Sequence, residues 1–348
     1  MTSTGTRGAI MLAEIGEQPA SMDRLLADGL ADIRAVARTV AAAAPRFVLL
    51  AARGTSDHAA LYAKYLLETR LGLPVGLVSP STLTVFGATP DFRDVLWISV
   101  SQSGGSPDLV ESTTRARQCG ALTVAVTNVA GSPLNQASEL SIDVLAGPEK
   151  AVAATKSYTS ELMALYLLVD AWAGGDAQAV RAIPQQAQQV VDRSEATRVA
   201  PRYRFVDRLV LTGRGFAYPT AREAALKLME TSYLSAHAFS SADLMHGPLA
   251  MIDEDRPVIA VVPHGLGGAA MVPVLERLGE RGADVLVVGD SSLATNPADT
   301  IWLPGDVDEN VAPMLQIIPL QQLAAAMAVA RGYDPDAPRG LRKVTETL

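Results

Sequence analysis

Short runs of apolar residues alternate with longer segments of helical periodicity along most of the chain. Near-continuous apolar runs are typical of parallel β-strands that are covered on both faces. In the first half of the chain they lie at residues 47–52 (FVLLAA), 95–100 (VLWISV) and 122–126 (LTVAV). Strands of this kind, separated by helices, predict an α/β unit with a parallel sheet.

The same order recurs in the second half, with apolar runs at residues 208–212, 257–262 and 285–288. Glycines that follow the apolar runs or helices in the first half recur 161 or 162 positions later in the second half. The pairs are Gly54 and Gly215, Gly105 and Gly267, and Gly120 and Gly282. A period of this length indicates two domains rather than a solenoid. The sequence therefore predicts two tandem α/β domains, each a five-stranded parallel sheet flanked by helices.

The predicted domain limits follow from the helices that flank the apolar runs. A helix over 151–172 ends the first domain, and a Gln-rich helix over 184–196 leads into the second. The predicted segments are an N-terminal helical segment (1–40), a first domain (41–180), a second domain (181–335) and a C-terminal tail (336–348). Ligands of such sheets bind outside the carboxyl ends of the strands, where the motifs below all lie.

A loop rich in hydroxyl groups and glycine follows the strand at 95–100. It reads SQSGGSP (101–107) and opens a helix. Unpaired N–H groups and the helix dipole favour an anion there, and Pro107 fits the first helical turn. The equivalent second-half loop, PHGLG (263–267), has lost every hydroxyl, which favours a single phosphate site in the first half. A serine-rich N-cap without ligand is the alternative.

Two other segments lie near this predicted site. The turn RGTS (53–56) ends the first strand at the same edge, so Thr55 and Ser56 either touch the ligand or cap a helix. The stretch VAATK (152–156) begins another helix and offers backbone donors.

A helix of the second half carries ionisable groups at regular spacing. Glu223, Lys227 and Glu230 stand at i, i+4 and i+7 and so share one face. His246 follows in a loop marked by Gly247 and Pro248. Two carboxylates, an amine and an imidazole are the groups needed to move protons on a sugar. The alternatives are a solvated, ion-paired helix face and an ordinary loop histidine.

Composition narrows the class of protein. The 348 residues are 49% hydrophobic and 19% charged, so we expect a packed core. A net charge of −8 without a Lys/Arg cluster argues against binding of nucleic acid. Cys119, the single cysteine, predicts a buried structural thiol and a reducing compartment. We expect no secretory signal and no membrane span, and hence a cytoplasmic protein. The spacing of the four histidines predicts no metal, and no glycine turn predicts a dinucleotide cofactor.

Ordered motifs along nearly the whole chain resemble those of one family. They are MLAEIGEQP (11–19), RGTS (53–56), SQSGGSPD (101–108), AGPEKAVAATKSYT (146–159), the stretch 213–248 and PRGLRKVTETL (338–348). The chain resembles SIS (sugar isomerase) family proteins with two SIS domains, of the kind that forms the isomerase half of glutamine–fructose-6-phosphate aminotransferase.

This resemblance implies a role for each matching position. Glu230 is expected to be the base that carries a proton between C1 and C2 of the sugar, with Lys227 and Glu223 as neighbours. His246 is expected to open the sugar ring, reaching the site from the other subunit of an obligate homodimer. Lys343 is expected to form a Schiff base, in a tail that closes over the site. The remaining positions bind substrate: Ser101, Gln102, Ser103 and Ser106 the phosphate, and Gly54, Thr55, Ser56, Val152 and Ala153 the sugar.

Departures from the pattern shape the expected reaction. The aminotransferase has a glutaminase domain that starts with a catalytic cysteine, and we expect this chain to lack that domain, since residue 2 is Thr and Cys119 lies elsewhere. We therefore expect conversion of glucosamine 6-phosphate to fructose 6-phosphate and ammonia, as in SIS-type glucosamine-6-phosphate deaminases. Four differences from the family pattern are expected to lie around the sugar or His246 and leave the identity of the substrate open, at Ala154, His237, Asp243 and Met245. The alternatives are a deglycase or isomerase for another amino-sugar or fructosamine phosphate, and a non-catalytic sugar-phosphate sensor.

Overall fold

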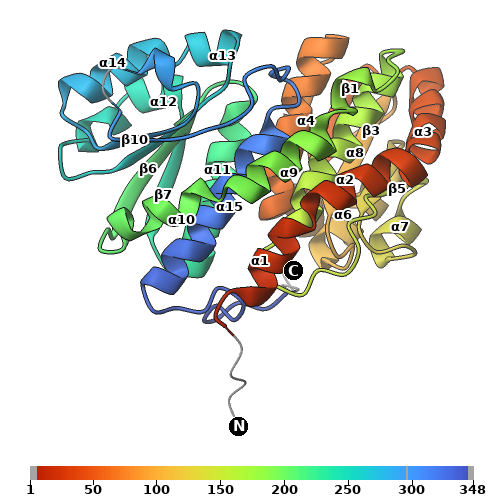
Figure 1. Cartoon of the computed structure of the whole chain (residues 1–348). Helices are drawn as coiled ribbons and strands as arrows, with labels where there is room; N and C mark the ends of the chain where they lie inside the picture. The colour runs from red at the N-terminus through yellow and green to blue at the C-terminus, as the bar shows by residue number, and fades with distance from the viewer. Residues whose placement is uncertain (1–5, 295–296, 344–348) are drawn as a thin grey trace. The chain divides into compact units, whose positions relative to one another are not determined.

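The computed structural model describes residues 6–294 and 297–343. The chain forms two compact units, which we describe separately (Figure 1). The first-half unit contains residues 20–149, 156–181 and 342–343, and the second-half unit contains residues 6–19, 150–155 and 182–341. Each unit therefore includes a segment that is distant in sequence. In the second-half unit, α1 (Ala9–Gly16) contacts α15 (Pro313–Ala330), near the other end of the chain (Figure 1).

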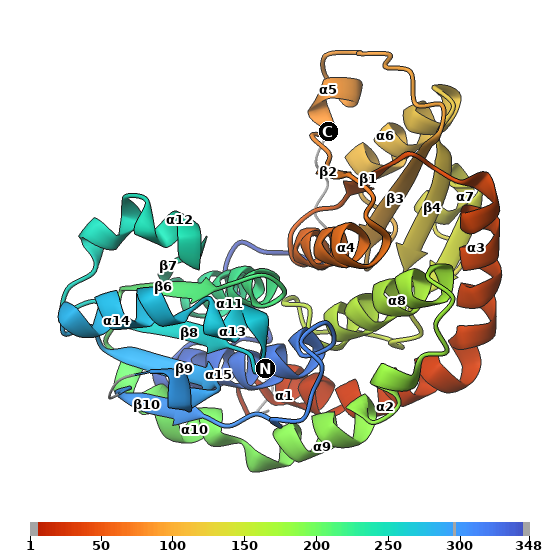
Figure 2. The ribbon, with the colours of Figure 1, turned by 90° about the horizontal axis from the view of Figure 1, so that it is seen from above.

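The first-half unit is built on a five-stranded parallel sheet of order β2-β1-β3-β4-β5. Its strands are β1 (Phe47–Ala51), β2 (Val75–Leu77), β3 (Val95–Ser101), β4 (Leu122–Thr127) and β5 (Leu140–Asp143). The chain runs through α2 (Gln18–Arg24), a π-helix (Leu25–Gly29), α3 (Leu30–Ala43), α4 (Thr55–Leu71), α5 (Ser81–Thr84), α6 (Pro107–Gln118), α7 (Pro133–Ala137) and α8 (Lys156–Trp172). Buried Trp97 of β3 packs with Leu83, Leu109 and Leu134 from α5, α6 and α7 on one face, while α4 and α8 lie on the other (Figure 2).

The second-half unit repeats this topology, with sheet order β10-β9-β8-β6-β7. Its strands are β6 (Arg208–Gly213), β7 (Ser235–Ser240), β8 (Val258–Val262), β9 (Val285–Gly289) and β10 (Asp299–Ile301). Its further helices are α9 (Ile183–Arg193), α10 (Glu195–Val199), α11 (Ala217–Ser232), α12 (Ser241–Met245), α13 (Leu266–Ala269) and α14 (Val272–Glu280). Short 3₁₀ turns of this unit lie at Ala200–Tyr203, Pro248–Met251 and Ser291–Leu293, and one of the first-half unit lies at Gln178–Val180. Every strand has its counterpart in the other sheet, which confirms the predicted duplication.

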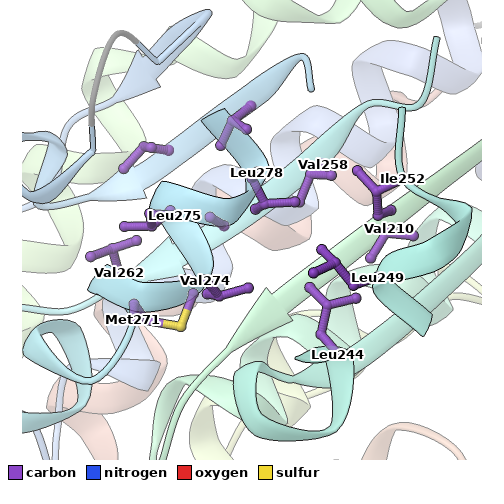
Figure 3. Packing of buried hydrophobic residues seen from close by; sticks show 13 residues of the cluster. Val210, Leu244, Leu249, Ile252, Val258, Val262, Met271, Val274, Leu275 and Leu278 are labelled. Carbon is purple, nitrogen blue, oxygen red and sulfur yellow. The ribbon is translucent and has the colours of Figure 1, made fainter. Parts of the chain in front are cut away.

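One face of the second sheet carries a dense apolar core (Figure 3). Val258 and Val262 of β8 meet Val274 and Leu278 of α14, and all four side chains are almost completely buried. The two valines lie four positions apart along a strand and so point to the same side of the sheet. The opposite face is covered by α11, which packs on β6 and β8 and contacts α15. This packing fixes α11, the helix that carries the predicted ionisable groups, against the sheet.

Two predicted helices have different limits in the structure. The helix expected over 151–172 begins only at Lys156, because the N–H groups of Lys150 and Ala151 donate to the carboxylate of Glu14 instead of entering a helix. The helix expected over 184–196 is divided into α9 and α10 at Ser194, whose left-handed backbone (φ 47°) interrupts the helical turn.

The predicted strand at 257–262 begins one residue later, at Val258. Pro257 has no N–H to donate, although its carbonyl accepts from Val210. Cys119 is half-buried at the C-cap of α6, so the prediction of a buried thiol is wrong.

Helix α15 is long and apolar enough to cross a membrane by length and composition, with a mean hydropathy of 1.3. However, 83% of this helix is buried inside the structure. Gln316, Gln321 and Gln322 lie within the helix and are themselves buried. These properties are those of a core helix that packs against α11 and α9.

Candidate functional site

Two loops lie beside each other at the carboxyl edge of the first sheet, because β1 and β3 are hydrogen-bonded neighbours. The loop after β1 turns at Gly54, whose backbone (φ 57°, ψ −129°) lies in a region that only glycine adopts readily. Gly54 is the N-cap of α4 and has no side chain. The alternative that Thr55 or Ser56 caps this helix is therefore wrong.

Ser56 is held below this edge by a buried carboxylate. Its hydroxyl donates to Oε1 of Glu161 at 2.9 Å, and both residues are almost completely buried. Glu161 lies on α8, so this contact joins the start of α4 to the helix beside it. The structure thus shows Ser56 in a structural hydrogen bond, which the sequence did not predict. Its role toward a sugar stays a prediction.

The loop at 101–107 is shaped by its own serines. The backbone N–H of Gly104 donates to Ser101 Oγ, and the N–H of Gly105 donates to Ser103 Oγ, both at 3.2 Å. Gly104 has a positive φ of 61°, and a Cβ there would lie 2.1 Å from the hydroxyl oxygen of Ser132. The loop therefore requires glycine for both its backbone conformation and the space beside it.

Ser106 is the N-cap of α6, and Pro107 occupies the first turn. The side chain of Ser106 makes no capping hydrogen bond, so the alternative of a simple serine cap is wrong for this residue. Gln102 is anchored through its carbonyl, which accepts from the N–H of Asn128. The serine hydroxyls and the first-turn N–H groups of α6 gather at one helix N-terminus, which is the arrangement that favours an anion.

An ion pair beside this loop was not predicted. Asp108, in the first turn of α6, is almost completely buried, and its Oδ2 lies 2.7 Å from Nη2 of Arg53. Arg53 follows β1 and is about half exposed. The guanidinium offsets a carboxylate that would otherwise repel an anion at the loop. Sequence spacing alone cannot find this pair, because the two residues meet only when β1 and β3 lie side by side.

The predicted ionisable face of α11 forms a buried cluster. Lys227 Nζ lies 3.2 Å from Oε1 of Glu223 and 2.6 Å from Oε2 of Glu230. The side chains of Glu223 and Lys227 are 0% exposed and that of Glu230 is 22% exposed. The prediction of a shared helix face is confirmed, and the alternative of a solvated face is wrong. One carboxylate of the cluster, that of Glu230, is accessible from outside.

The pKa of Lys227 is raised well above its ordinary value of 10.5. Burial alone would lower this pKa, but the charges of Glu223 and Glu230 and their hydrogen bonds outweigh the burial. Lys227 therefore remains an ammonium at neutral pH. It holds the Glu230 side chain in place through a charge-assisted hydrogen bond.

His246 lies outside the α11 cluster. It is the exposed C-cap residue of α12, and its backbone N–H donates to the carbonyl of Asp243. Gly247 follows with a φ of 121°, which turns the chain before Pro248. Val152 and Ala153, predicted to contact the sugar, lie in the short segment 150–155 of the second-half unit, with Val152 half-buried and Ala153 buried.

Lys343 is bound to a carboxylate that sequence reasoning missed. Its Nζ donates to Oε2 of Glu149 at 2.9 Å. Glu149 also accepts from the backbone N–H and the hydroxyl of Ser157, at 3.1 and 2.7 Å. The Glu149 side chain is 0% exposed and that of Lys343 is 25% exposed. Glu149 lies inside the motif AGPEKAVAATKSYT, so this motif was the feature of the sequence that could have indicated Glu149 as a functional residue. The rest of the predicted tail, residues 344–348, lies outside the described residues.

The second-half loop at 263–267 is occupied by the chain's own carboxylate. Oε1 of Glu309 accepts from the N–H of Gly267 at 2.7 Å. Burial raises the pKa of Glu309, while hydrogen bonds from the N–H groups of Gly267 and Leu266 oppose that rise. The predicted asymmetry between the two loops thus has a structural counterpart. The loop without hydroxyls is closed by an internal anion.

Comparison with known proteins identifies the family. The SIS domain family matches residues 44–171 and 203–331. Among curated relatives, the chain is 34% identical over 348 residues to a glutamine–fructose-6-phosphate aminotransferase (isomerizing) of Methanothermobacter thermautotrophicus and 36% identical over 357 residues to that of Pyrobaculum aerophilum. Each alignment covers 99% of this chain but only 58% of the relative, so the chain spans little more than half the length of these proteins.

Solved structures give a closer match in length. The C-terminal domain of glucosamine-fructose-6-phosphate aminotransferase from Francisella tularensis superposes with a TM-score of 0.85 at 27% identity, covering 97% of this chain and 100% of that domain. Glucosamine-6-phosphate deaminase from Thermotoga maritima has a TM-score of 0.75 at 21% identity, covering 97% and 100% of the two chains, and this likeness shows the fold alone. The duplicated sheets and the two family matches agree, and the chain belongs to the SIS domain family, with two SIS domains in tandem.

Proposed function

We propose that the chain is a phosphosugar isomerase and deaminase that converts glucosamine 6-phosphate to fructose 6-phosphate and ammonia. The observation that carries this proposal is the buried cluster on α11, in which Lys227 fixes Glu230 while leaving it 22% exposed. A positioned carboxylate that reaches the surface of a buried ionic cluster suits the role of a general base. The serine loop at 101–106 offers donors suited to the phosphate.

The proposed reaction needs one base that works at two neighbouring carbons. In the open-chain aminosugar, Glu230 removes the proton from C2, giving an enolamine whose C1 oxygen takes up a proton. Returning a proton to C1 leaves an imine at C2, and water then converts this imine to the ketone and releases ammonia. Lys227 stays protonated throughout, since its pKa is raised, and it holds the carboxylate in position.

The reaction proposed for this chain differs from the full reaction of its longer relatives. The matched region corresponds to the whole C-terminal domain of an aminotransferase. We propose that this region handles the sugar and free ammonia but does not hydrolyse glutamine. We also propose that this reaction takes place in the cytoplasm, which a phosphorylated sugar substrate supports.

The direct test incubates the purified chain with glucosamine 6-phosphate and follows ammonia and fructose 6-phosphate together. Both products should form in equal amounts, and Glu230→Gln should slow their formation about 10²- to 10⁴-fold, the usual contribution of a general base. Glu276→Gln, at an exposed position of α14, is the matched control and should be fully active. If wild-type protein forms neither product but acts on another aminosugar phosphate, the substrate is wrong and the reaction class stands.

We further propose a homodimer in which His246 of each subunit completes the partner's site and opens the sugar ring. Mixing Glu230→Gln and His246→Asn proteins under conditions that exchange subunits tests this arrangement. One of the two sites of a mixed dimer would then contain both native residues, so activity should reappear. If His246 acts within its own subunit, both sites of the mixed dimer lack one residue and no activity returns.

A further inference from the structure

Glu149 is a buried carboxylate with Lys343 as one of its partners. It lies in the first-half unit together with Ser157 and Lys343, the other members of the contact. Its side chain is 0% exposed, and its carboxylate accepts hydrogen bonds from the backbone N–H and the hydroxyl of Ser157 and from Lys343. A buried charge is costly unless such partners compensate it, so this arrangement holds the carboxylate in one geometry.

The contacts with Ser157 hold the Glu149 carboxylate at the start of a helix. Ser157 lies in the first turn of α8, where backbone N–H groups have no partner inside the helix. The carboxylate therefore binds a helix N-terminus through the N–H of Ser157 and is further fixed by its hydroxyl. A negative charge at this end of a helix is also favoured by the helix dipole.

Lys343 is, by contrast, a long side chain on a segment near the end of the chain. A lysine amine loses considerable rotamer freedom when it is fixed, so an unsupported lysine is poorly placed for attack. The contact of 2.9 Å to Glu149 supplies this support, while 25% of the lysine side chain remains exposed. The side chain is therefore anchored at its amine and still partly exposed.

We infer that Glu149 is the positioning residue for Lys343: it orients the ε-amino group toward the substrate carbonyl and accepts the proton that this group must lose. The inference rests on the proposed function, because it takes fructose 6-phosphate, the proposed product, as the ketose whose C2 Lys343 attacks. The ammonium of Lys343 transfers one proton to the Glu149 carboxylate, and the neutral amine forms a bond to C2 of fructose 6-phosphate. The carbonyl oxygen leaves as water, which gives a Schiff base. Glu149 is not expected to touch the sugar.

The experiment traps this Schiff base. Wild-type protein and variants are mixed with fructose 6-phosphate and sodium borohydride, and the reduced adduct is quantified by mass spectrometry of the peptide containing Lys343. Glu149→Gln should reduce the trapping rate about 10- to 100-fold at saturating sugar, as expected for misplacing a reacting group. The concentration of sugar that gives half the maximal rate should stay unchanged, because Glu149 does not bind substrate. Glu68→Gln, in an exposed lysine–glutamate pair of α4, is the matched control and should trap like wild type.

A second variant separates positioning from folding. Glu149→Asp keeps the charge and should recover part of the trapping rate that Glu149→Gln loses. If Glu149→Gln does not fold, Glu149→Asp alone decides, and it should trap more slowly than wild type at unchanged sugar affinity. Equal trapping in wild type and the folded Glu149 variants would overturn the inference, as would a change in sugar affinity alone.

The proposed function and this inference fail in different ways. Ammonia release from glucosamine 6-phosphate without any trapped adduct in wild type overturns the inference and leaves the deaminase proposal intact. Trapping that depends on Glu149, without ammonia release, overturns the deaminase proposal and supports the role of Glu149 toward a ketose phosphate.

Discussion

Replacing Lys227 by methionine tests the electrostatics of the buried cluster on α11. Methionine is similar in length to lysine and carries no charge. The variant therefore removes the cation and leaves the carboxylates of Glu223 and Glu230 on the same helix face without it. At an effective dielectric constant of about 20, unit charges 2.6–3.2 Å apart attract by about 5–6 kcal/mol per contact before desolvation is subtracted. Removing one partner of a buried pair costs about 3–5 kcal/mol in measured cases.

We therefore expect Lys227→Met to lose about 3–5 kcal/mol of unfolding free energy at neutral pH, measured by urea denaturation. This is a large share of the 5–15 kcal/mol that stabilises a typical protein. The raised pKa of Lys227 sets the sign with pH. Its stabilising contribution is fully present below the ordinary pKa of 10.5 and is lost only as the pH rises above that value.

Two further variants complete this test. Arg277→Met removes an exposed i, i+3 ion pair of α14 in the same unit, where both side chains are more than half exposed, and should cost less than about 1 kcal/mol. Combining Lys227→Met with Glu223→Gln also removes the buried charge of Glu223, which has lost its cation. This double variant should therefore recover part of the unfolding free energy that Lys227→Met loses. The reasoning would be refuted if Lys227→Met were as stable as Arg277→Met, or if the double variant were no more stable than Lys227→Met.

Two other predictions follow from the loops. Gly104→Ala should destabilise the chain by about 1–3 kcal/mol and weaken substrate binding, because the φ of Gly104 is 61° and an added Cβ would clash with Ser132. Gly87→Ala is the control, since Gly87 has a φ of 65° and open space around it, so this variant measures the cost of the backbone conformation alone. Denaturation curves and KM values distinguish the two variants. Glu309→Gln keeps an acceptor for Gly267 but removes a carboxyl whose pKa burial raises. In wild type, the stability gained by that raised pKa is present below about 4.5 and is lost as the pH rises through the folded-state value. Denaturation measured from about pH 4 to 7 should show the unfolding free energy of Glu309→Gln rising relative to that of wild type as the pH rises. If the difference in unfolding free energy stays constant with pH, the raised pKa of Glu309 is contradicted.

The fold was largely predictable because its signals are local or repeated. Parallel strands buried on both faces are apolar along most of their length, so β3 and β8 are visible in the sequence as near-continuous apolar runs. Gly54 and Gly215 share a φ of 57°, which explains why both halves keep glycine at that turn. The helix limits were less predictable, since Glu14 diverts the backbone before α8 from more than a hundred residues away.

The candidate site was predictable only where its residues share one element. The spacing of Glu223, Lys227 and Glu230 encodes their contacts directly, because one helix fixes all three positions. Two ion pairs join residues that are distant in sequence, Arg53–Asp108 and Glu149–Lys343. No periodicity in the sequence predicts such contacts. Burial is also absent from the sequence pattern. An ion-paired helix face looks the same whether it meets solvent or, like Lys227, is 0% exposed.

The duplication explains why one chain would carry one site for a sugar phosphate rather than two. Both halves provide a loop between a strand and a helix N-terminus, but in the second half the N–H of Gly267 already donates to Glu309. An internal carboxylate satisfies such a group permanently, so this loop needs no external anion. The first-half loop keeps three serine hydroxyls and pairs its nearest buried carboxylate, Asp108, with Arg53. The second half in turn carries the buried cluster on α11. Each copy of the fold has therefore kept the features suited to one part of the proposed reaction.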